Sequence, residues 1–141
     1  MIDTEYIGAS CELVELQKIR NFIEKKALEY GLSEKSAGQV ALAVDEACTN
    51  LIEHAFHHDK NREICISTEK SGDKMIVSIF DDSSPFNPLD VEKPNMDIYF
   101  KELKRGGLGI HLMRSVMDEI EYYPSKQNGS QNVLKLIKKI N

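Results

Sequence analysis

Residues 45–56 read DEACTNLIEHAF, the most informative stretch of the chain. At about 100° per residue in a helix, the apolar side chains fall on one face, which comprises Val44, Cys48, Leu51 and Ala55. Glu46 and Asn50 are one turn apart and lie roughly opposite this face. Ala43 and Ala47 flank them with methyl groups, which leave room for a ligand close to the helix. The spacing alone also fits a solvated helix face, so it does not decide between a binding site and a plain surface.

Helical and extended patterns surround this stretch. Ser33 is a good N-cap for the central helix, and Ser10 and Gly31 have the residue types that begin and end the helix before it. Alternating apolar residues and turn residues indicate two strand pairs after it. The predicted elements are a strand over 2–8, a helix over 11–30, a helix from Ser33 to about Phe56 or His58, strands over 62–69 and 74–80, a helix over 108–118, and strands over 119–125 and 131–138.

This order predicts an α+β fold. Helices grouped on one face of a mainly antiparallel, mixed sheet make a two-layer α/β sandwich. The length of 141 residues suits one domain, which we expect to span 1–141. Residues 81–106 are broken by three prolines, with a turn of helix expected around 98–103, and a loop this long is usually functional.

Two further segments carry candidate chemistry. Asp81 follows the apolar strand directly, where a carboxylate can accept hydrogen bonds from a ligand amino group; a polar turn is the simpler interpretation. Residues 105–110 read RGGLGI before a predicted helix. Glycines let the backbone approach a ligand, and the unpaired N–H groups of a helix N-terminus favour an anion. This segment lacks the G-K-[ST] of a P-loop, and no βαβ unit surrounds it.

Composition narrows the class of protein. The net charge is −5, from 18 basic and 23 acidic residues, which argues against broad nucleic-acid binding. No apolar run approaches the roughly 18 residues of a membrane span, and the N-terminus does not resemble a signal peptide. The three cysteines have no CxxC spacing, so we expect free thiols in a reducing compartment. We therefore expect a cytoplasmic protein that contacts neither nucleic acid nor membrane.

In combination, the three segments resemble the N, G1 and G2 boxes of the GHKL (Bergerat) ATP-binding fold. Within this fold, the chain is most similar to the anti-sigma-factor serine/threonine kinases, and the likeness spans nearly the whole chain. The segments that carry it are DEACTNLIEHAF (45–56), DDSSPFNP (81–88) and RGGLGIHLMRSVMDEIEY (105–122). The resemblance implies a histidine-kinase-like ATPase domain that uses ATP and Mg²⁺. It also implies two partners, a sigma factor and a STAS-domain anti-anti-sigma factor phosphorylated on serine, and a homodimer.

Residue roles follow from the resemblance. Glu46 matches the catalytic base, Asn50 the residue that holds Mg²⁺, Thr49 a contact to the terminal phosphate, and Asp81 the adenine-binding aspartate. Residues 82–106 match the ATP lid. The nucleotide-binding positions at its end are Arg105, Gly106, Gly107, Leu108, Gly109 and Ile110, with Gly107 and Gly109 as the phosphate-lid glycines and Arg105 as a basic residue near the phosphates or the partner.

One position departs from the family pattern. Ser83 stands where the G1 box has glycine, and a side chain there adds bulk or strain near the nucleobase. A second possible function is therefore a partner-switch module that binds nucleotide weakly or not at all and has no kinase activity. An ATP hydrolase, in which Glu46 orients water, and an unrelated α+β domain also stay open. For His54, His57 and His58, at helical intervals, solvated or locally bonded side chains fit better than a metal site.

Overall fold

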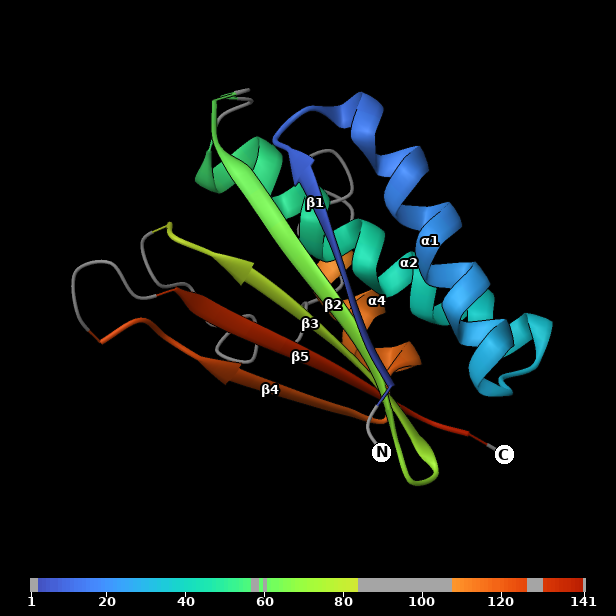
Figure 1. Cartoon of the computed structure of the whole chain (residues 1–141). Coiled ribbons are helices and arrows are strands. Elements are labelled where there is room, and N and C mark those ends of the chain that lie inside the picture. The colour runs from blue at the N-terminus through green and yellow to red at the C-terminus, as the bar shows by residue number, and fades with distance from the viewer. Residues whose placement is uncertain (1–2, 57–58, 60, 84–107, 127–130, 141) are drawn as a thin grey trace, which may run out of the picture.

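The computed structural model describes residues 3–56, 59, 61–83, 108–126 and 131–140. Five strands form one sheet, and the helices lie against one of its faces (Figure 1). In chain order the elements are β1 (Asp3–Ser10), the 3-10 turn η1 (Leu13–Glu15), α1 (Leu16–Tyr30), α2 (Glu34–Asn50), the π-helical turn η2 (Leu51–Ala55), β2 (Glu63–Ser71), β3 (Lys74–Asp81), α4 (Leu108–Val116), β4 (Glu119–Tyr123) and β5 (Asn132–Lys139).

The strands follow the order β1-β2-β3-β5-β4 across the sheet. Each pairing between the described strands is antiparallel, so the sheet is more regular than the mixed sheet predicted. The strand β5 enters between β3 and β4, and this crossover joins the C-terminal strand pair to the rest of the sheet. The α+β two-layer architecture predicted from the sequence is confirmed.

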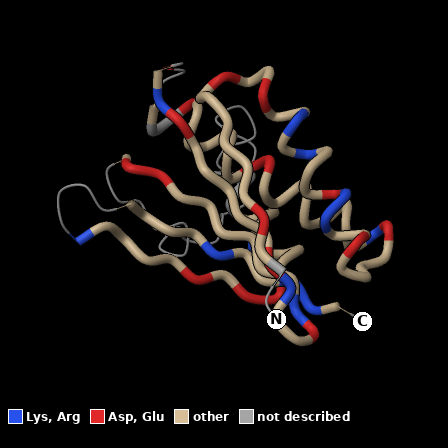
Figure 2. Tube along the Cα trace, in the orientation of Figure 1, with Lys and Arg blue, Asp and Glu red and all other residues tan. Residues whose placement is uncertain are grey.

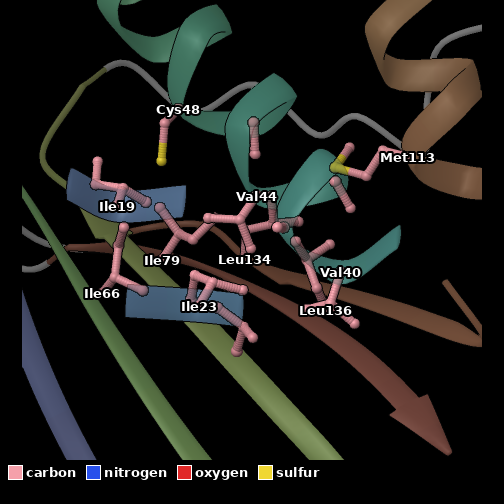
Figure 3. Packing of buried hydrophobic residues seen from close by; sticks show 14 of the residues in the cluster. Ile19, Ile23, Val40, Val44, Cys48, Ile66, Ile79, Met113, Leu134 and Leu136 are labelled. Carbon is pink, nitrogen blue, oxygen red and sulfur yellow. The ribbon is translucent and has the colours of Figure 1, made fainter. Parts of the chain in front are cut away.

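The two faces of the sheet differ because side chains alternate along a strand. Val77 and Ile79 of β3 are buried on the helix-covered face, where Ile79 pairs with Ile66 of β2 and Leu134 of β5. Figure 3 shows Ile66, Ile79 and Leu134 beneath Val44 and Cys48 of α2. The same view shows Ile19 and Ile23 of α1 close by and Met113 of α4 at the right. Asp81 continues the same alternation and therefore belongs to the helix-covered face.

The helix α1 begins later than predicted. Ser10 does not cap it, because Ser10 is still paired with Glu63 in the β1–β2 ladder and the N–H of Cys11 donates to the carbonyl of Arg62 at 3.1 Å. The chain then turns through η1 before the regular helix. The end of α1 is as predicted: Gly31 has a φ of 106°, and the N–H of Leu32 donates to the carbonyl of Ala27 at 3.0 Å.

A buried lysine ties α1 to the edge of the sheet. Lys26 is 4% exposed, and its Nζ lies 2.9 Å from a carboxylate oxygen of Glu5 in β1 and 3.0 Å from one of Glu29. Burial alone would lower the pKa of Lys26, but the hydrogen bonds with Glu5 and Glu29 raise it above its ordinary value. Figure 2 shows that residues of both charges, acidic and basic, occur along α1.

Of the helices in the described ranges, none is long and apolar enough to span a bilayer.

Candidate functional site

The exposed edge of α2 carries the first group of predicted residues. Ser33 caps this helix by accepting a hydrogen bond from the N–H of Ser36 at 3.1 Å, as its sequence position predicts. Glu46, Thr49 and Asn50 are all half-buried near its C-terminal end. The prediction that Ala43 and Ala47 leave room for a ligand is wrong, because both are buried in the core, where α2 packs against α1 and α4.

The α-helical hydrogen bonding of α2 ends at Asn50. The next five residues form the π-turn η2, and the N–H of Phe56 donates to the carbonyl of Leu51 at 2.8 Å. The sequence predicted one continuous helix to Phe56 or His58. A π-turn widens the helix by one residue and shifts the faces of the residues that follow it, and such turns are frequent at functional sites. The change of geometry therefore starts directly after Asn50.

Glu46 has the surroundings of a weak acid. Burial raises its pKa, and the negative charges of Asp45 and Glu53 raise it further. Asp45 is itself paired, since its Oδ1 lies 2.6 Å from Nη1 of Arg20 on α1. A carboxylate with a raised pKa is better suited to accept a proton than an ordinary surface glutamate.

Asp81 is buried at the end of β3 and has strongly unequal oxygens. Its Oδ1 accepts hydrogen bonds from the N–H of Ser83 at 2.9 Å, from the Oγ of Ser83, and from Nδ2 of Asn132 at 3.1 Å. Its Oδ2 has no hydrogen-bond partner within the described part of the chain. This oxygen is left to accept a hydrogen bond from a ligand, as the predicted adenine contact requires.

A chain of contacts connects the end of α2 with the end of β3. The guanidinium of Arg62 lies over the ring of Phe56, 4.8 Å from its centroid, and also pairs with the carboxylate of Asp82. Because Phe56 follows η2 and Asp82 follows Asp81, the two segments lie at the same end of the molecule, as Figure 1 also shows. The fold therefore brings the ends of the predicted N-box and G1-box segments, at Phe56 and Asp82, to one place.

The glycine-rich segment is only partly described. Leu108, Gly109 and Ile110 form the first turn of α4, which begins where the sequence predicted and ends at Val116. This helix packs against α2, so its N-terminal turn belongs to the same helical layer as Glu46. The structure does not describe residues 84–107. These residues include Arg105, Gly106, Gly107, most of the predicted lid over 82–106 and the turn predicted around 98–103.

The remaining predicted features lie elsewhere or outside the described ranges. Cys11 and Cys48 are buried, Cys65 is half-buried and all three are free thiols; burial raises the pKa of Cys11 to about 11. Within the described ranges, no group of three or more His, Cys, Asp or Glu is placed to hold a metal ion. His57 and His58 are outside those ranges.

Two residues at the site were missed by the sequence prediction. Asn132 is 1% exposed and contacts Asp81, although it lies 51 positions away along the chain. The sequence does contain one indication of this role. Asparagine is disfavoured in strands, and Asn132 begins the strand NVLKLIKK. Arg62 had no signal, because an arginine before a strand is ordinary.

Comparisons with known proteins identify a matching family and similar proteins. Residues 9–138 match the protein family described as "Histidine kinase-like ATPase domain". The chain is 31% identical to the serine-protein kinase RsbW of Bacillus subtilis (strain 168) over 121 residues, which cover 82% of this chain and 69% of that protein. It is 28% identical to the anti-sigma F factor of Clostridium perfringens (strain SM101 / Type A) over 102 residues, covering 72% of this chain and 71% of that one.

A solved structure has the same fold. The crystal structure of the RsbU and RsbW domains of Rv1364c from Mycobacterium tuberculosis superimposes with a TM-score of 0.66 and 14% sequence identity. The match covers 98% of this chain and 32% of the other, so the present chain spans about a third of that protein.

Proposed function

The chain belongs to the histidine kinase-like ATPase family, and from that membership we propose that it is an ATP-dependent serine/threonine protein kinase that acts as an anti-sigma factor. The substrate is a serine on a STAS-domain anti-anti-sigma factor, and the protein that it restrains is a sigma factor. The names of its relatives, a serine-protein kinase and an anti-sigma F factor, support this function. The homodimer, the single domain over 1–141 and the lid over 82–106 belong to the same proposal.

One structural observation carries this proposal. Glu46 and Asn50 are half-buried on α2, and the Phe56–Arg62–Asp82 contacts connect the end of that helix with Asp81. An acid–base group and an amide oxygen thus share one end of the molecule with a carboxylate oxygen that has no partner in the described part of the chain. A nucleotide needs these three kinds of contact at its phosphates, its metal and its base.

The residues fit ATP and Mg²⁺. Asp81 Oδ2 would accept a hydrogen bond from the amino group of adenine, and the side-chain oxygen of Asn50 would hold Mg²⁺, which prefers oxygen ligands. Thr49 and the N–H groups of Leu108, Gly109 and Ile110 would contact the phosphates. The family resemblance assigns Arg105, Gly106 and Gly107 to the same role. Bound Mg²⁺ supplies neutralisation of phosphate charge. The helix N-terminus adds neutralisation without lysines, which suits an acidic chain.

Glu46 performs the proton transfer. Its carboxylate accepts the proton of the substrate serine hydroxyl as the serine oxygen attacks the γ-phosphorus; the bond from that phosphorus to the bridging oxygen breaks, and ADP leaves. Such a base contributes roughly 10²–10⁴-fold to the rate. The product carries a phosphate of about −1.5 to −2 charges. That charge is sufficient to weaken the contact between the kinase and its phosphorylated substrate. Phosphoryl transfer therefore controls which partner the kinase binds.

The test is transfer of labelled γ-phosphate to a STAS-domain protein in the presence of Mg²⁺. Glu46→Gln keeps the size of the side chain and removes the base, so we expect transfer to fall at least a hundredfold while ATP binding persists. Glu24→Gln, an exposed change on α1, is the matched control. Equal transfer by the wild type and Glu46→Gln would overturn the assigned base.

Ser83 favours a second candidate function, a partner-switch module without kinase activity. The Oγ of Ser83 adds a donor to Asp81 at the position of the family glycine. Titration of the wild type with millimolar Mg·ATP distinguishes the two functions. Binding without transfer to any STAS protein, or no binding at all, would favour the module, and release of free phosphate would favour an ATP hydrolase.

A further inference from the structure

Asp81 and Asn132 face each other across the β3–β5 pairing. They are register partners, and both are almost completely buried, at 5% and 1% exposure. A buried carboxylate is costly unless donors surround it. The structure supplies those donors from two segments that are remote in sequence.

The side chain of Asn132 has a hydrogen bond at every one of its polar groups. Its Nδ2 donates to Oδ1 of Asp81 at 3.1 Å and to the carbonyl of Ser83 at 2.8 Å, and its Oδ1 accepts from the N–H of Ser125 at 2.8 Å. Rotation of the amide by 180° would place an oxygen against two acceptors, so the network permits one orientation only. Asn132 is therefore locked, and it holds β3, the turn after β3 and the segment after β4 together.

Ser83 completes the set of donors. Its N–H and its Oγ both donate to the Oδ1 of Asp81 that Asn132 also contacts. A carboxylate oxygen has about two lone-pair directions, so three donors saturate Oδ1. A small rotation of the carboxylate would weaken these three hydrogen bonds, so its plane is held and Oδ2 keeps one direction. The residue that replaces the family glycine thus strengthens the asymmetry of Asp81.

We propose that Asn132 is a positioning residue that, with Ser83, holds the plane of the Asp81 carboxylate so that Oδ2 keeps a constant direction toward the nucleobase, and that this positioning sharpens the preference of Asp81 for bases with an exocyclic amino group. The inference rests on the proposed function, because it requires a nucleotide at Asp81. Adenine presents an N–H donor to Oδ2. Hypoxanthine carries a carbonyl oxygen at the same position, and two acceptors repel each other. A carboxylate free to rotate would discriminate less.

The test compares Mg·ATP with Mg·ITP, which differ at that position of the base. Dissociation constants are measured by calorimetry for the wild type and for Asn132→Ala. We expect Asn132→Ala to weaken ATP binding about tenfold, the value of one hydrogen bond to a charged group, and to change ITP binding by less than about twofold. The preference for ATP over ITP therefore falls about tenfold. Gln131→Ala, at the exposed neighbouring position, keeps the wild-type preference.

A second variant guards against misfolding of the first. Ser83→Ala keeps the backbone donor and removes only Oγ, so we expect a roughly threefold loss of the ATP preference with an unchanged melting temperature. An unchanged preference in both variants, or an equal loss of ATP and ITP binding in both, would overturn this inference while the proposed function stands. Failure of the wild type to bind ATP would overturn the proposed function and this inference with it.

Discussion

Glu46 sets the pH range in which the proposed transfer operates. Its pKa is raised by burial and then by the charges of Asp45 and Glu53. The base acts only when deprotonated, so activity falls as the pH drops through the raised value. We expect the acidic limb of kcat/KM for phosphoryl transfer to lie above pH 4.5, the ordinary value for a glutamate.

Glu53→Gln should move that limb to lower pH. The substitution removes one of the negative charges that disfavour ionisation of Glu46, so its pKa falls toward the ordinary value. The measurement is kcat/KM between about pH 4 and 8, the range in which raised carboxyl groups titrate, with Glu24→Gln as the control. A limb that stays in place, or one that moves to higher pH, would show that the charge of Glu53 does not reach the base.

At this scale the sequence indicates candidate residues but not the side-chain contacts between them. Glu46, Asn50 and Asp81 were identified because short words around them match family boxes, and the structure brings their segments to one end of the molecule. Asn132 was not predicted as a site residue, because it contacts Asp81 only through the β3–β5 pairing. Ser83 was predicted to add bulk or strain near the nucleobase, and in the structure its Oγ donates a hydrogen bond to Asp81. Side-chain networks between distant segments have no local signature.

Two glycines in the helical layer should respond to alanine in opposite directions. Gly38 lies inside α2 with open space around it, so Gly38→Ala should stabilise the protein by about 0.5–1 kcal/mol. Gly31 has a φ of 106° at the end of α1, and Gly31→Ala should cost about 1 kcal/mol. Its added Cβ would lie 3.4 Å from Ile140 Cγ2, an ordinary contact, so the cost arises from the backbone. Urea unfolding measures both; effects of equal sign would contradict the assignment.

Lys26 should matter for the attachment of α1 to β1. Lys26→Ala removes a buried stem and both ion pairs, and the carboxylates left behind are half exposed, so we expect a loss of about 2 kcal/mol in the free energy of unfolding. Lys26→Met keeps the stem and should lose about half as much. Since the pKa of Lys26 is raised, its contribution is complete below pH 10.5 and is lost as the pH rises further. If the Lys26→Ala variant had the same free energy of unfolding as the wild type at neutral pH, this role of Lys26 would be contradicted.

The elements themselves were largely predictable, and their ends were not. Alternation and helical periodicity located the helices and strands because each pattern repeats within one segment. The start of α1 was misplaced because Ser10 has the chemistry of a cap, yet β-pairing with Glu63 takes precedence over it. The π-turn after Asn50 has no sequence signal, since its residues also suit an α-helix.

Nucleotide binding should stabilise the whole molecule. Mg·ATP at a hundred times its dissociation constant should raise the free energy of unfolding by about 2.7 kcal/mol, or the melting temperature by roughly 8 °C. Asp81→Asn keeps an oxygen for the Ser83 and Asn132 donors and replaces Oδ2 with an amide nitrogen, so most of this shift should disappear. EDTA should reduce the shift in the wild type. An identical shift in Asp81→Asn would contradict the role of Oδ2.

The architecture was predictable as a class, whereas the strand order was not. Helices on one face of an antiparallel sheet follow from the order of elements. The insertion of β5 between β3 and β4 depends on which edges meet once all strands exist, and it is this insertion that places Asn132 against Asp81.

The interior position of β5 also has a consequence for biosynthesis. During translation, the segments that form β1, α1, α2, β2 and β3 leave the ribosome well before residues 132–139. Until β5 is available, one hydrogen-bonding edge of β3 therefore has no partner strand. Asp81 lacks its asparagine donor throughout that interval. A nascent chain of this length therefore lacks the side chain that we propose to position Asp81. Its unpaired β3 edge can also pair with strands of other chains until residues 132–139 have been translated.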